Sequence, residues 1–242
     1  MGVVSAALKN VRCPRTAAVI VAGGSGTRFG GDKLMAELGG TPVLARSLMA
    51  FQRSEFISEI VLAVRQDMIE DAGRLCRGYG VTKLAVIVPG GQTRLLSSLA
   101  GVMAVSPETE LIAIHDGARP LVTEKIIEDA VWGAYRHGAA AAAIPVKDTI
   151  KQAEDGLVTK TPDRKSLFAV QTPQCFQADI IRGALSDAAK NAPDITDDCM
   201  AVERLGGGVY LTPGSEENLK ITTPLDLAVA EAILKRREPS CE

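Results

Sequence analysis

Short apolar runs alternate with amphipathic segments along most of this chain. The apolar runs predict β-strands at residues 17–22, 60–64, 84–88, 111–115 and 139–145. The segments between them carry apolar residues at helical spacing, which predicts helices at residues 42–53, 67–77, 93–105 and 123–137. Strands that alternate with helices in this way are typical of βαβ units. We therefore expect an α/β fold with a mostly parallel sheet flanked by helices.

Two of the expected helices have clear signals at their N-terminal ends. Thr123 can cap the start of the helix at 123–137. Near the C-terminus, Thr223 is followed by Pro224 at the first helical position and Asp226 at the third. This pattern predicts a last helix that runs to about residue 237.

The segment at 146–176 breaks the alternation. It is polar, its short runs predict strands, and Asp155-Gly156 is typical of a β-hairpin turn. We interpret it as a β-arm inserted into the α/β domain. The expected organisation is a loose N-terminal leader at 1–15 and a single Rossmann-like domain at 16–242, with the arm at about 146–176.

The composition agrees with a folded domain and narrows the possible functions. The 242 residues include 27 Lys and Arg against 29 Asp and Glu, a net charge of −2, and 46% are hydrophobic. The apolar content excludes the disordered class, and the near-neutral charge argues against nucleic-acid binding. Small phosphorylated ligands stay open, because they need only a few local cations. Aromatic residues make up 4%, so we expect backbone groups, not stacked rings, to hold any base.

Cysteine usage and hydropathy indicate the compartment. The five cysteines are widely spaced, and neither a CxxC pair nor a Cys/His cluster supports a zinc site or a disulfide framework. The N-terminal stretch does not have the cations-first pattern of a signal peptide. No stretch approaches the roughly 18 apolar residues of a membrane span. We expect a cytoplasmic protein with reduced thiols and no membrane partner.

The first predicted strand leads directly into a glycine-rich loop, AVIVAGGSGTRFGGDK. Gly23, Gly24 and Gly26 can bring backbone N–H groups close to a ligand, and Arg28 and Lys33 add two positive charges that suit a triphosphate. The loop is not a Walker motif, and it lacks the third glycine of a dinucleotide fingerprint. A structural turn between strand and helix, with both cations solvated, is the alternative.

A second candidate motif, LIAIHDGARP, ends another predicted strand. Ligand sites of open parallel sheets lie at the carboxyl ends of their strands. Asp116 there can hold Mg²⁺ against phosphate oxygens, and Arg119 can bind a phosphate. The structural alternative is a turn in which Asp116 caps a local N–H and Arg119 pairs with an acid. We expect His115 to pack at the strand end without a catalytic role.

These motifs resemble those of one enzyme superfamily. VAGGSGTRFGGDKLMAELGGTPVL resembles the loop of sugar-phosphate nucleotidyltransferases, and HDGARP resembles the corresponding motif of the 2-C-methyl-D-erythritol 4-phosphate cytidylyltransferase family. The resemblance covers about residues 17–236. It extends, in order, to PGGQTRLLSSLAGV, PVKDTIK, DRKSLFAVQTPQCF, DITDDCMAVERLG and ENLKITTPLDLAVAE. An ordered set of this kind is far more specific than any single motif.

The resemblance implies a role for each matching residue. The catalytic residues would be Arg28, Lys33 and Lys220. The nucleotide would be bound by Ala22, Gly23, Gly24, Gly26, Gly91 and Ser97. The sugar phosphate would be bound by Asp116, Arg119, Thr149, Arg164, Thr172 and Thr196, with Asp116 also holding Mg²⁺ or another divalent cation. Each residue has a structural alternative, such as a helix cap for Thr196.

The implied reaction transfers CMP from CTP to 2-C-methyl-D-erythritol 4-phosphate and releases pyrophosphate, in non-mevalonate isoprenoid synthesis. The resemblance also implies a homodimer formed through the β-arm, in which Arg164 completes the neighbouring site. The short spacing from Arg28 to Lys33 resembles that of molybdopterin nucleotidyltransferases, and Gln92 stands where an acid is often found. The alternatives are therefore a nucleotidyltransferase acting on ribitol 5-phosphate or molybdopterin, and a non-catalytic CTP-binding module.

Overall fold

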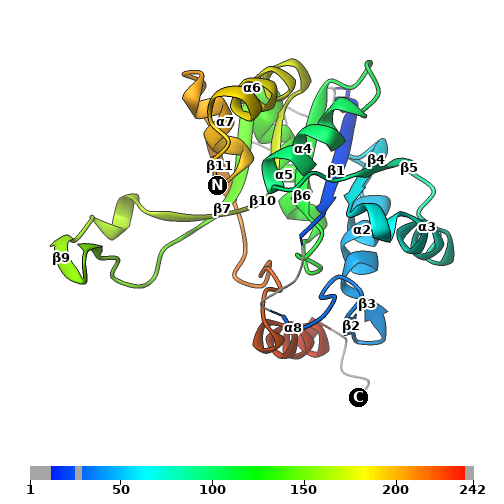
Figure 1. Cartoon of the computed structure of the whole chain (residues 1–242), viewed down its shortest axis with the longest axis horizontal. Coiled ribbons are helices and arrows are strands. Elements are labelled where there is room, and N and C mark those ends of the chain that lie inside the picture. The colour runs from blue at the N-terminus through cyan, green and yellow to red at the C-terminus, as the bar shows by residue number, and fades with distance from the viewer. Residues whose placement is uncertain (1–11, 25–28, 238–242) are drawn as a thin grey trace.

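The predicted strands all belong to one seven-stranded sheet (Figure 1). The computed structural model describes residues 12–24 and 29–237. The strands are β1 (Thr16–Ala22), β4 (Glu59–Val64), β5 (Leu84–Pro89), β6 (Leu111–Asp116), β7 (Ala139–Pro145), β10 (Phe168–Gln177) and β11 (Tyr210–Pro213). Their order is β11-β7-β10-β6-β1-β4-β5. Strand β10 is antiparallel to both its neighbours, and the other pairs are parallel.

The long apolar run of β1 reflects a sheet that is covered on both faces. In β1, Ala18 and Ile20 belong to one hydrophobic cluster, whereas Val19 and Val21 belong to the other. Every residue of β1 is buried. Alternate side chains of a strand point to opposite faces, so an uninterrupted apolar run serves a two-sided core.

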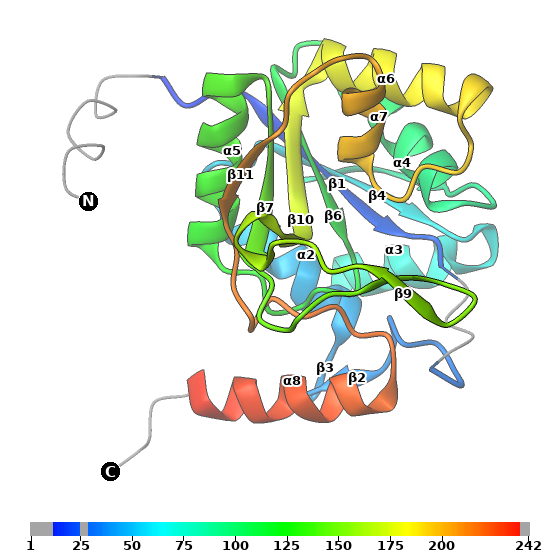
Figure 2. The same cartoon turned by 90° about the vertical axis from the view of Figure 1, so that its left-hand side faces the viewer.

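Helices pack on both faces of the sheet (Figure 2). The first cluster contains side chains of α2 (Val43–Arg53), α3 (Ile69–Gly78) and α5 (Glu124–His137). The second contains side chains of α4 (Arg94–Met103), α6 (Ala178–Asn191) and α7 (Asp198–Arg204). The predicted mostly parallel α/β fold is therefore confirmed. The cap predicted for α5 is also present, since the Thr123 side chain accepts a hydrogen bond from the Ile126 N–H.

The polar segment contains the predicted hairpin, but its C-terminal end belongs to the sheet. The hairpin pairs β8 (Gln152–Glu154) with β9 (Leu157–Lys160), and it projects away from the sheet (Figure 1). Its turn has positive φ at Asp155 (48°) and Gly156 (83°), as a tight hairpin requires. Residues 171–176, which we expected in the arm, are buried in β10. The expected arm boundary at 176 is therefore wrong. The polar side chains of this stretch of β10 suggested an exposed arm, but they are buried and make hydrogen bonds inside the protein.

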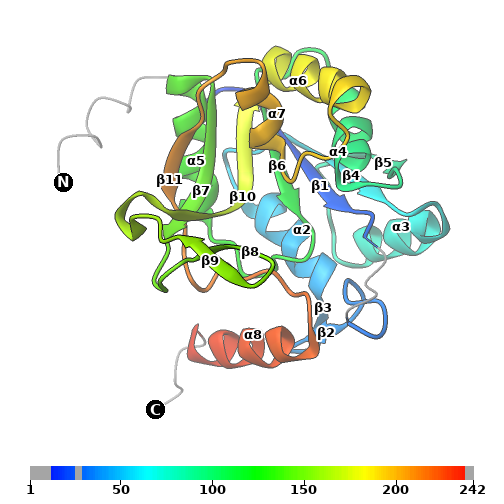
Figure 3. The ribbon, with the colours of Figure 1, turned by 60° about the vertical axis from the view of Figure 1, so that its left-hand side comes forward.

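Helix α8 (Pro224–Arg237) packs away from the sheet, against a third small cluster beside β2 (Glu37–Leu38) and β3 (Thr41–Pro42) (Figure 3). Its start has the predicted capping arrangement. The Asp226 carboxylate accepts a hydrogen bond from the Thr223 N–H at 2.8 Å, and the Thr223 hydroxyl accepts one from the Asp226 N–H at 3.4 Å. This reciprocal pair fixes where the chain turns from the preceding loop into α8.

The contact between α5 and the sheet leaves no room for a side chain at Gly133. A Cβ atom there would lie 2.8 Å from Ala140 Cβ and 2.8 Å from Thr212 Cγ2. We expect Gly133→Ala to lower the free energy of unfolding by about 1–3 kcal/mol, measured by urea denaturation. Gly183→Ala is the matched control in α6, where nothing lies within 4 Å. It should raise stability by up to about 1 kcal/mol through helix propensity, and a gain at both positions would contradict the packing argument.

Candidate active site

A cavity of about 520 Å³ opens at the carboxyl ends of the parallel strands. It lies where the strand order reverses, because β4 and β5 follow β1 on one side and β6 lies on the other. Such a reversal is the expected ligand site of an open α/β sheet. The cavity is lined by Val21, Ala22, Gly23, Gly24, Lys33, Leu34, Arg65, Gln66, Gly90, Gly91, Gln92, Thr93, Arg94, Ser97, Asp116, Ala118 and Lys220.

One wall of the cavity is made largely of backbone. A Cβ at Gly23 would lie 2.9 Å from Ser97 Oγ, and one at Gly91 would lie 2.2 Å from Leu96 Cβ. Glycine is therefore required for the two loops to approach α4 so closely. The Ser97 hydroxyl donates to the carbonyl of Thr93 at 2.9 Å. In this structure Ser97 fixes the loop before α4 and also lines the cavity.

Lys33 reaches the cavity from a turn built around Asp32. The Asp32 carboxylate accepts a hydrogen bond from the Leu34 N–H at 3.1 Å, and its other oxygen lies 3.5 Å from Arg65 Nη2 at the end of β4. The side chain therefore links the turn to the sheet. This arrangement places Lys33 on the cavity wall despite the short spacing after the glycine loop.

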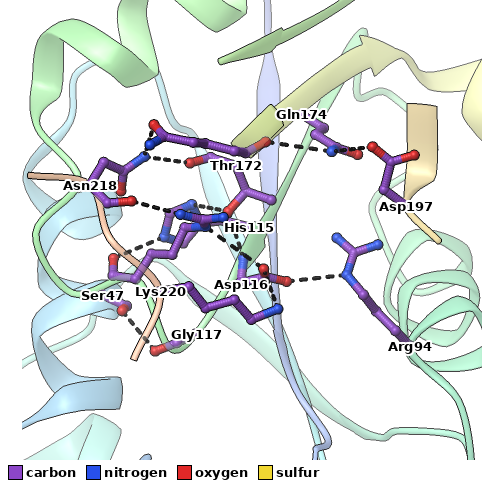
Figure 4. Close-up of polar contacts among 12 residues, drawn as sticks. Ser47, Arg94, His115, Asp116, Gly117, Thr172, Gln174, Asp197, Asn218 and Lys220 are labelled. Carbon is purple, nitrogen blue, oxygen red and sulfur yellow. Dashed lines mark hydrogen bonds and ion pairs between the residues drawn. The ribbon is translucent and has the colours of Figure 1, made fainter. Parts of the chain in front are cut away.

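The Asp116 carboxylate is surrounded by three cations, two of which, Arg94 and Lys220, are labelled in Figure 4. Lys220 Nζ lies 2.8 Å from Oδ2, Arg94 Nε donates to Oδ1 at 3.2 Å, and Arg119 Nε lies 3.8 Å from Oδ2. Burial by itself opposes ionisation, but Arg94, Lys220 and Arg119 outweigh it and hold the pKa of Asp116 well below its ordinary value. The carboxylate is therefore a fixed negative charge in a cationic pocket.

Arg94 bridges Asp116 to a second, fully buried acid. Its Nη2 lies 2.8 Å from Asp198 Oδ2, and the Asp198 side chain has no exposed surface. Burial raises the pKa of Asp198, and the charge of Arg94 opposes that rise. The first residue of α4 is thus clamped between β6 and α7.

Thr172 is buried outside the cavity wall and is hydrogen-bonded to the HDGARP segment. Its hydroxyl accepts from the Asp116 N–H at 3.1 Å and lies 3.1 Å from His115 Nδ1. His115 Nε2 lies 3.2 Å from the carbonyl of Arg119. A carbonyl can only accept, so Nε2 carries the proton and the Thr172 hydroxyl donates to Nδ1. Burial lowers the pKa of His115 to about 4, which keeps the ring neutral.

The loop that carries Lys220 is pinned to β10 by a buried asparagine (Figure 4). Asn218 Nδ2 donates to the Gln171 side chain at 3.1 Å and to the Thr172 carbonyl at 3.0 Å. The Asn218 carbonyl accepts from Arg119 Nη1 at 2.7 Å. Polar side chains of β10 therefore position both Asp116 and Lys220.

Comparisons with known proteins identify the family. The IspD model, 2-C-methyl-D-erythritol 4-phosphate cytidylyltransferase, matches residues 16–236. The protein of that name from Alkaliphilus oremlandii is 43% identical over 227 residues, covering 92% of this chain and 96% of the relative. The one from Desulforamulus reducens is also 43% identical and covers 93% of this chain and 98% of the relative. The chain belongs to the IspD family.

Solved structures agree with this membership. The crystal structure of 4-diphosphocytidyl-2C-methyl-D-erythritol synthase from Anaerococcus prevotii has a TM-score of 0.83 at 31% identity, covering 92% of this chain and 97% of that one. The cytidylyltransferase of Thermus thermophilus has a TM-score of 0.74 at 30% identity, covering 90% and 98%. The resemblance stated from the motifs is therefore confirmed over most of the chain.

The predicted site residues of this IspD-family chain fall into three groups. The cavity wall contains Ala22, Gly23, Gly24, Lys33, Gly91, Ser97, Asp116 and Lys220. Gly26 and Arg28 lie outside the described residues. The remaining predicted residues do not line the cavity, and they are Arg119, Thr149, Arg164, Thr172 and Thr196. Arg119 and Thr172 both contact Asp116. Thr149 and Arg164 belong to the arm segment.

The site also uses residues that we did not predict. Gln174 accepts from the N–H groups of Asp198 and Cys199 at 3.1 and 3.2 Å, and it donates to Asp197 at 2.9 Å. Arg94 and Asn218 are the other important omissions. All these residues lie within the quoted motifs, but a single sequence gives no signal that separates a positioning side chain from its neighbours. Among the described residues, no group of three or more metal-ligating side chains and no membrane-spanning helix is found.

Loss of the Asn218 amide should loosen the Lys220 loop. Asn218→Ala leaves the Gln171 and Thr172 oxygens buried without these donors, and we expect unfolding free energy to fall by about 2–3 kcal/mol. The cytidylyltransferase rate should fall with it, because Lys220 lies two residues further along the loop. Thermal unfolding and pyrophosphate release measure the two effects. Asn191→Ala, at an exposed asparagine that bonds only within α6, is the control, and equal losses in both variants would refute the pinning role.

Proposed function

We propose how the residues of this site divide the work of cytidylyl transfer. As a member of the IspD family, the chain is a cytidylyltransferase that moves CMP from CTP to 2-C-methyl-D-erythritol 4-phosphate in isoprenoid biosynthesis. The observation that carries the assignment is the placement of Lys33 and Lys220 on the wall of one cavity together with Asp116.

The reaction needs positioning more than proton transfer. The phosphate of the acceptor attacks the α-phosphorus of CTP in line, and pyrophosphate leaves from the opposite side. The attacking oxygen is already ionised at neutral pH, so the site needs no strong general base. Catalysis then consists of holding both substrates in line and neutralising the charge that builds on the phosphates.

Lys33 and Lys220 supply this charge from two sides. Lys33 comes from the turn after the glycine loop, and Lys220 comes from the loop between β11 and α8. We assign Lys33, together with Arg28, to the triphosphate and Lys220 to the α-phosphate. Lys220 stands 2.8 Å from Asp116, so its ammonium is held on the cavity wall beside the carboxylate that we assign to Mg²⁺.

The base and ribose are assigned to the backbone wall. Ala22, Gly23 and Gly24 follow β1, and Gly91 lies opposite them before α4. Backbone N–H and C=O groups can read the edge of a base without an aromatic ring. The close packing at Gly23 and Gly91 supports this assignment, because a side chain there would move the wall.

Asp116 is the residue assigned to Mg²⁺. It is the one carboxylate among the described residues of the cavity wall, and Mg²⁺ is commonly held by one or two carboxylates together with substrate phosphates. When bound, the ion would draw charge from the phosphate oxygens. The chain's own part is to keep the carboxylate ionised and oriented, which Arg94 and Lys220 do.

The acceptor phosphate is assigned to Arg119, Thr149, Arg164, Thr172 and Thr196. Thr172 does not line the cavity and acts through its bond to the Asp116 backbone. Thr149 and Arg164 belong to an arm that carries exposed apolar residues, including Leu157 and Val158. We propose that this arm pairs with a second copy of the chain and that Arg164 completes the neighbouring site.

We also propose that the protein acts in the cytoplasm. The described cysteines Cys13, Cys76, Cys175 and Cys199 are free thiols, and the last three are buried. Burial raises the pKa of Cys76 to about 11 and that of Cys175 to about 12, so these thiols are unreactive core residues. Their unpaired state supports a reducing compartment.

Removal of either lysine should abolish most of the turnover. We expect Lys33→Ala and Lys220→Ala each to lower kcat by about 100-fold or more, because a positioned charge on the transition state is lost. Pyrophosphate release with CTP and methylerythritol phosphate measures the rate. Lys190→Ala, at an exposed lysine of α6, should keep the wild-type rate. Near-normal kcat in both active-site variants would overturn the assignment.

A panel of acceptors tests the substrate directly. We expect pyrophosphate release with CTP and 2-C-methyl-D-erythritol 4-phosphate to exceed that with ribitol 5-phosphate, or with GTP and molybdopterin, by at least about 100-fold. A higher rate with another pair would reassign the acceptor. Binding of CTP without pyrophosphate release from any pair would support a non-catalytic module instead.

A further inference from the structure

Hydrogen bonds and ion pairs connect Asp116 to the antiparallel strand β10. Two side chains of this strand take part, Thr172 at the Asp116 backbone and Gln174 at the start of α7. The start of α7 is fixed twice, because Gln174 also donates to Asp197. Asp198, the first residue of α7, is thereby placed with its side chain fully buried.

Arg94 forms ion pairs with this buried acid and with Asp116 on the cavity wall. Its Nη2 is 2.8 Å from Asp198 Oδ2, and its Nε donates to Asp116 Oδ1 at 3.2 Å. One planar guanidinium thus spans two carboxylates that come from α7 and β6. The exposed side-chain fraction falls from 26% at Arg94 to 10% at Asp116 and 0% at Asp198. The planar fork of arginine suits this geometry, and a lysine ammonium does not reproduce it.

The two oxygens of Asp116 therefore have different partners. Arg94 contacts Oδ1, while Lys220 contacts Oδ2 from the opposite loop. A carboxylate gripped at each oxygen cannot rotate freely. Removal of Arg94 would leave the carboxylate held only at Oδ2, by Lys220 and Arg119, and Lys220 is also assigned to the reacting phosphate.

We infer that Arg94 is a positioning residue of the reaction, anchored by Asp198, which acts by fixing the Asp116 carboxylate. This inference rests on the proposed function of the site. It differs from a direct contact between Arg94 and CTP, because its effect is expected on turnover and not on nucleotide affinity. It also gives Asp198, a residue outside the cavity wall, a role in catalysis through Arg94.

The test compares turnover and CTP affinity in matched variants. We expect Arg94→Gln to lower kcat by about 30-fold and Asp198→Ala by about 10-fold, as for a misplaced active-site group. The Kd of CTP, measured by calorimetry, should change by less than about 3-fold in both. Arg94→Lys should recover only part of the loss, and Asp198→Asn should recover most of it, because an amide of the same size keeps an oxygen against the guanidinium of Arg94.

The double variant separates coupling from independent damage. If Asp198 acts through Arg94, the kcat of Arg94→Gln with Asp198→Ala should equal that of Arg94→Gln alone. Arg94→Gln should also lower Tm by roughly 10 °C, because it leaves a buried carboxylate without its cation. Adding Asp198→Ala should restore part of that loss, and this comparison needs no turnover. Arg182→Gln, at a half-buried arginine of α6, is the control for kcat.

Each contrary result has a distinct meaning. Wild-type kcat in Asp198→Ala, multiplied losses in the double variant, or no recovery of Tm would overturn the positioning role. A large rise in the Kd of CTP for Arg94→Gln would also overturn it, in favour of direct nucleotide contact. Lack of turnover by the wild-type chain with every acceptor would instead reject the proposed function. The Tm comparison would still test the ion pair between Arg94 and Asp198.

Discussion

The Asp116 carboxylate, buried at the end of β6 among three cations, is the interaction on which the site depends. Burial disfavours its charge, and the attraction of Arg94, Lys220 and Arg119 compensates for that penalty. Each cation comes from a different part of the chain, so the site exists only when α4, the loop before α8 and the HDGARP turn meet. The fold brings these charges together around Asp116.

The antiparallel strand β10 does much of this positioning. Its buried polar residues Gln171, Thr172 and Gln174 hold, respectively, the Lys220 loop, the Asp116 backbone and the start of α7. A buried polar group is stable only when its hydrogen bonds are made. The hydrogen bonds that the polar side chains of β10 need are therefore the same bonds that order the active site. This explains why polar residues occupy a strand in the middle of the sheet.

Much of the architecture follows from local patterns. The strands at 17–22 and 139–145 are uninterrupted apolar runs, and the start of α8 is a reciprocal pair between Thr223 and Asp226. The site motifs could also be found, because the glycine loop and HDGARP lie at strand ends, and Lys33, Asp116 and Lys220 line one cavity. These features depend on neighbours in sequence or on an ordered set of motifs.

The sequence by itself determined the α/β class, the strand-end motifs and the family, because hydrophobic periodicity and motif order are local properties. Only the tertiary structure decided that residues 171–176 belong to the sheet, that Thr172 bonds the Asp116 backbone, and that Arg94 joins Asp116 to Asp198. The physical reason is that the sequence alone predicts a polar side chain to be exposed, unless the partner that allows its burial is known. For Arg94 and Asp198, that partner is about a hundred residues away in the chain and adjacent only after folding.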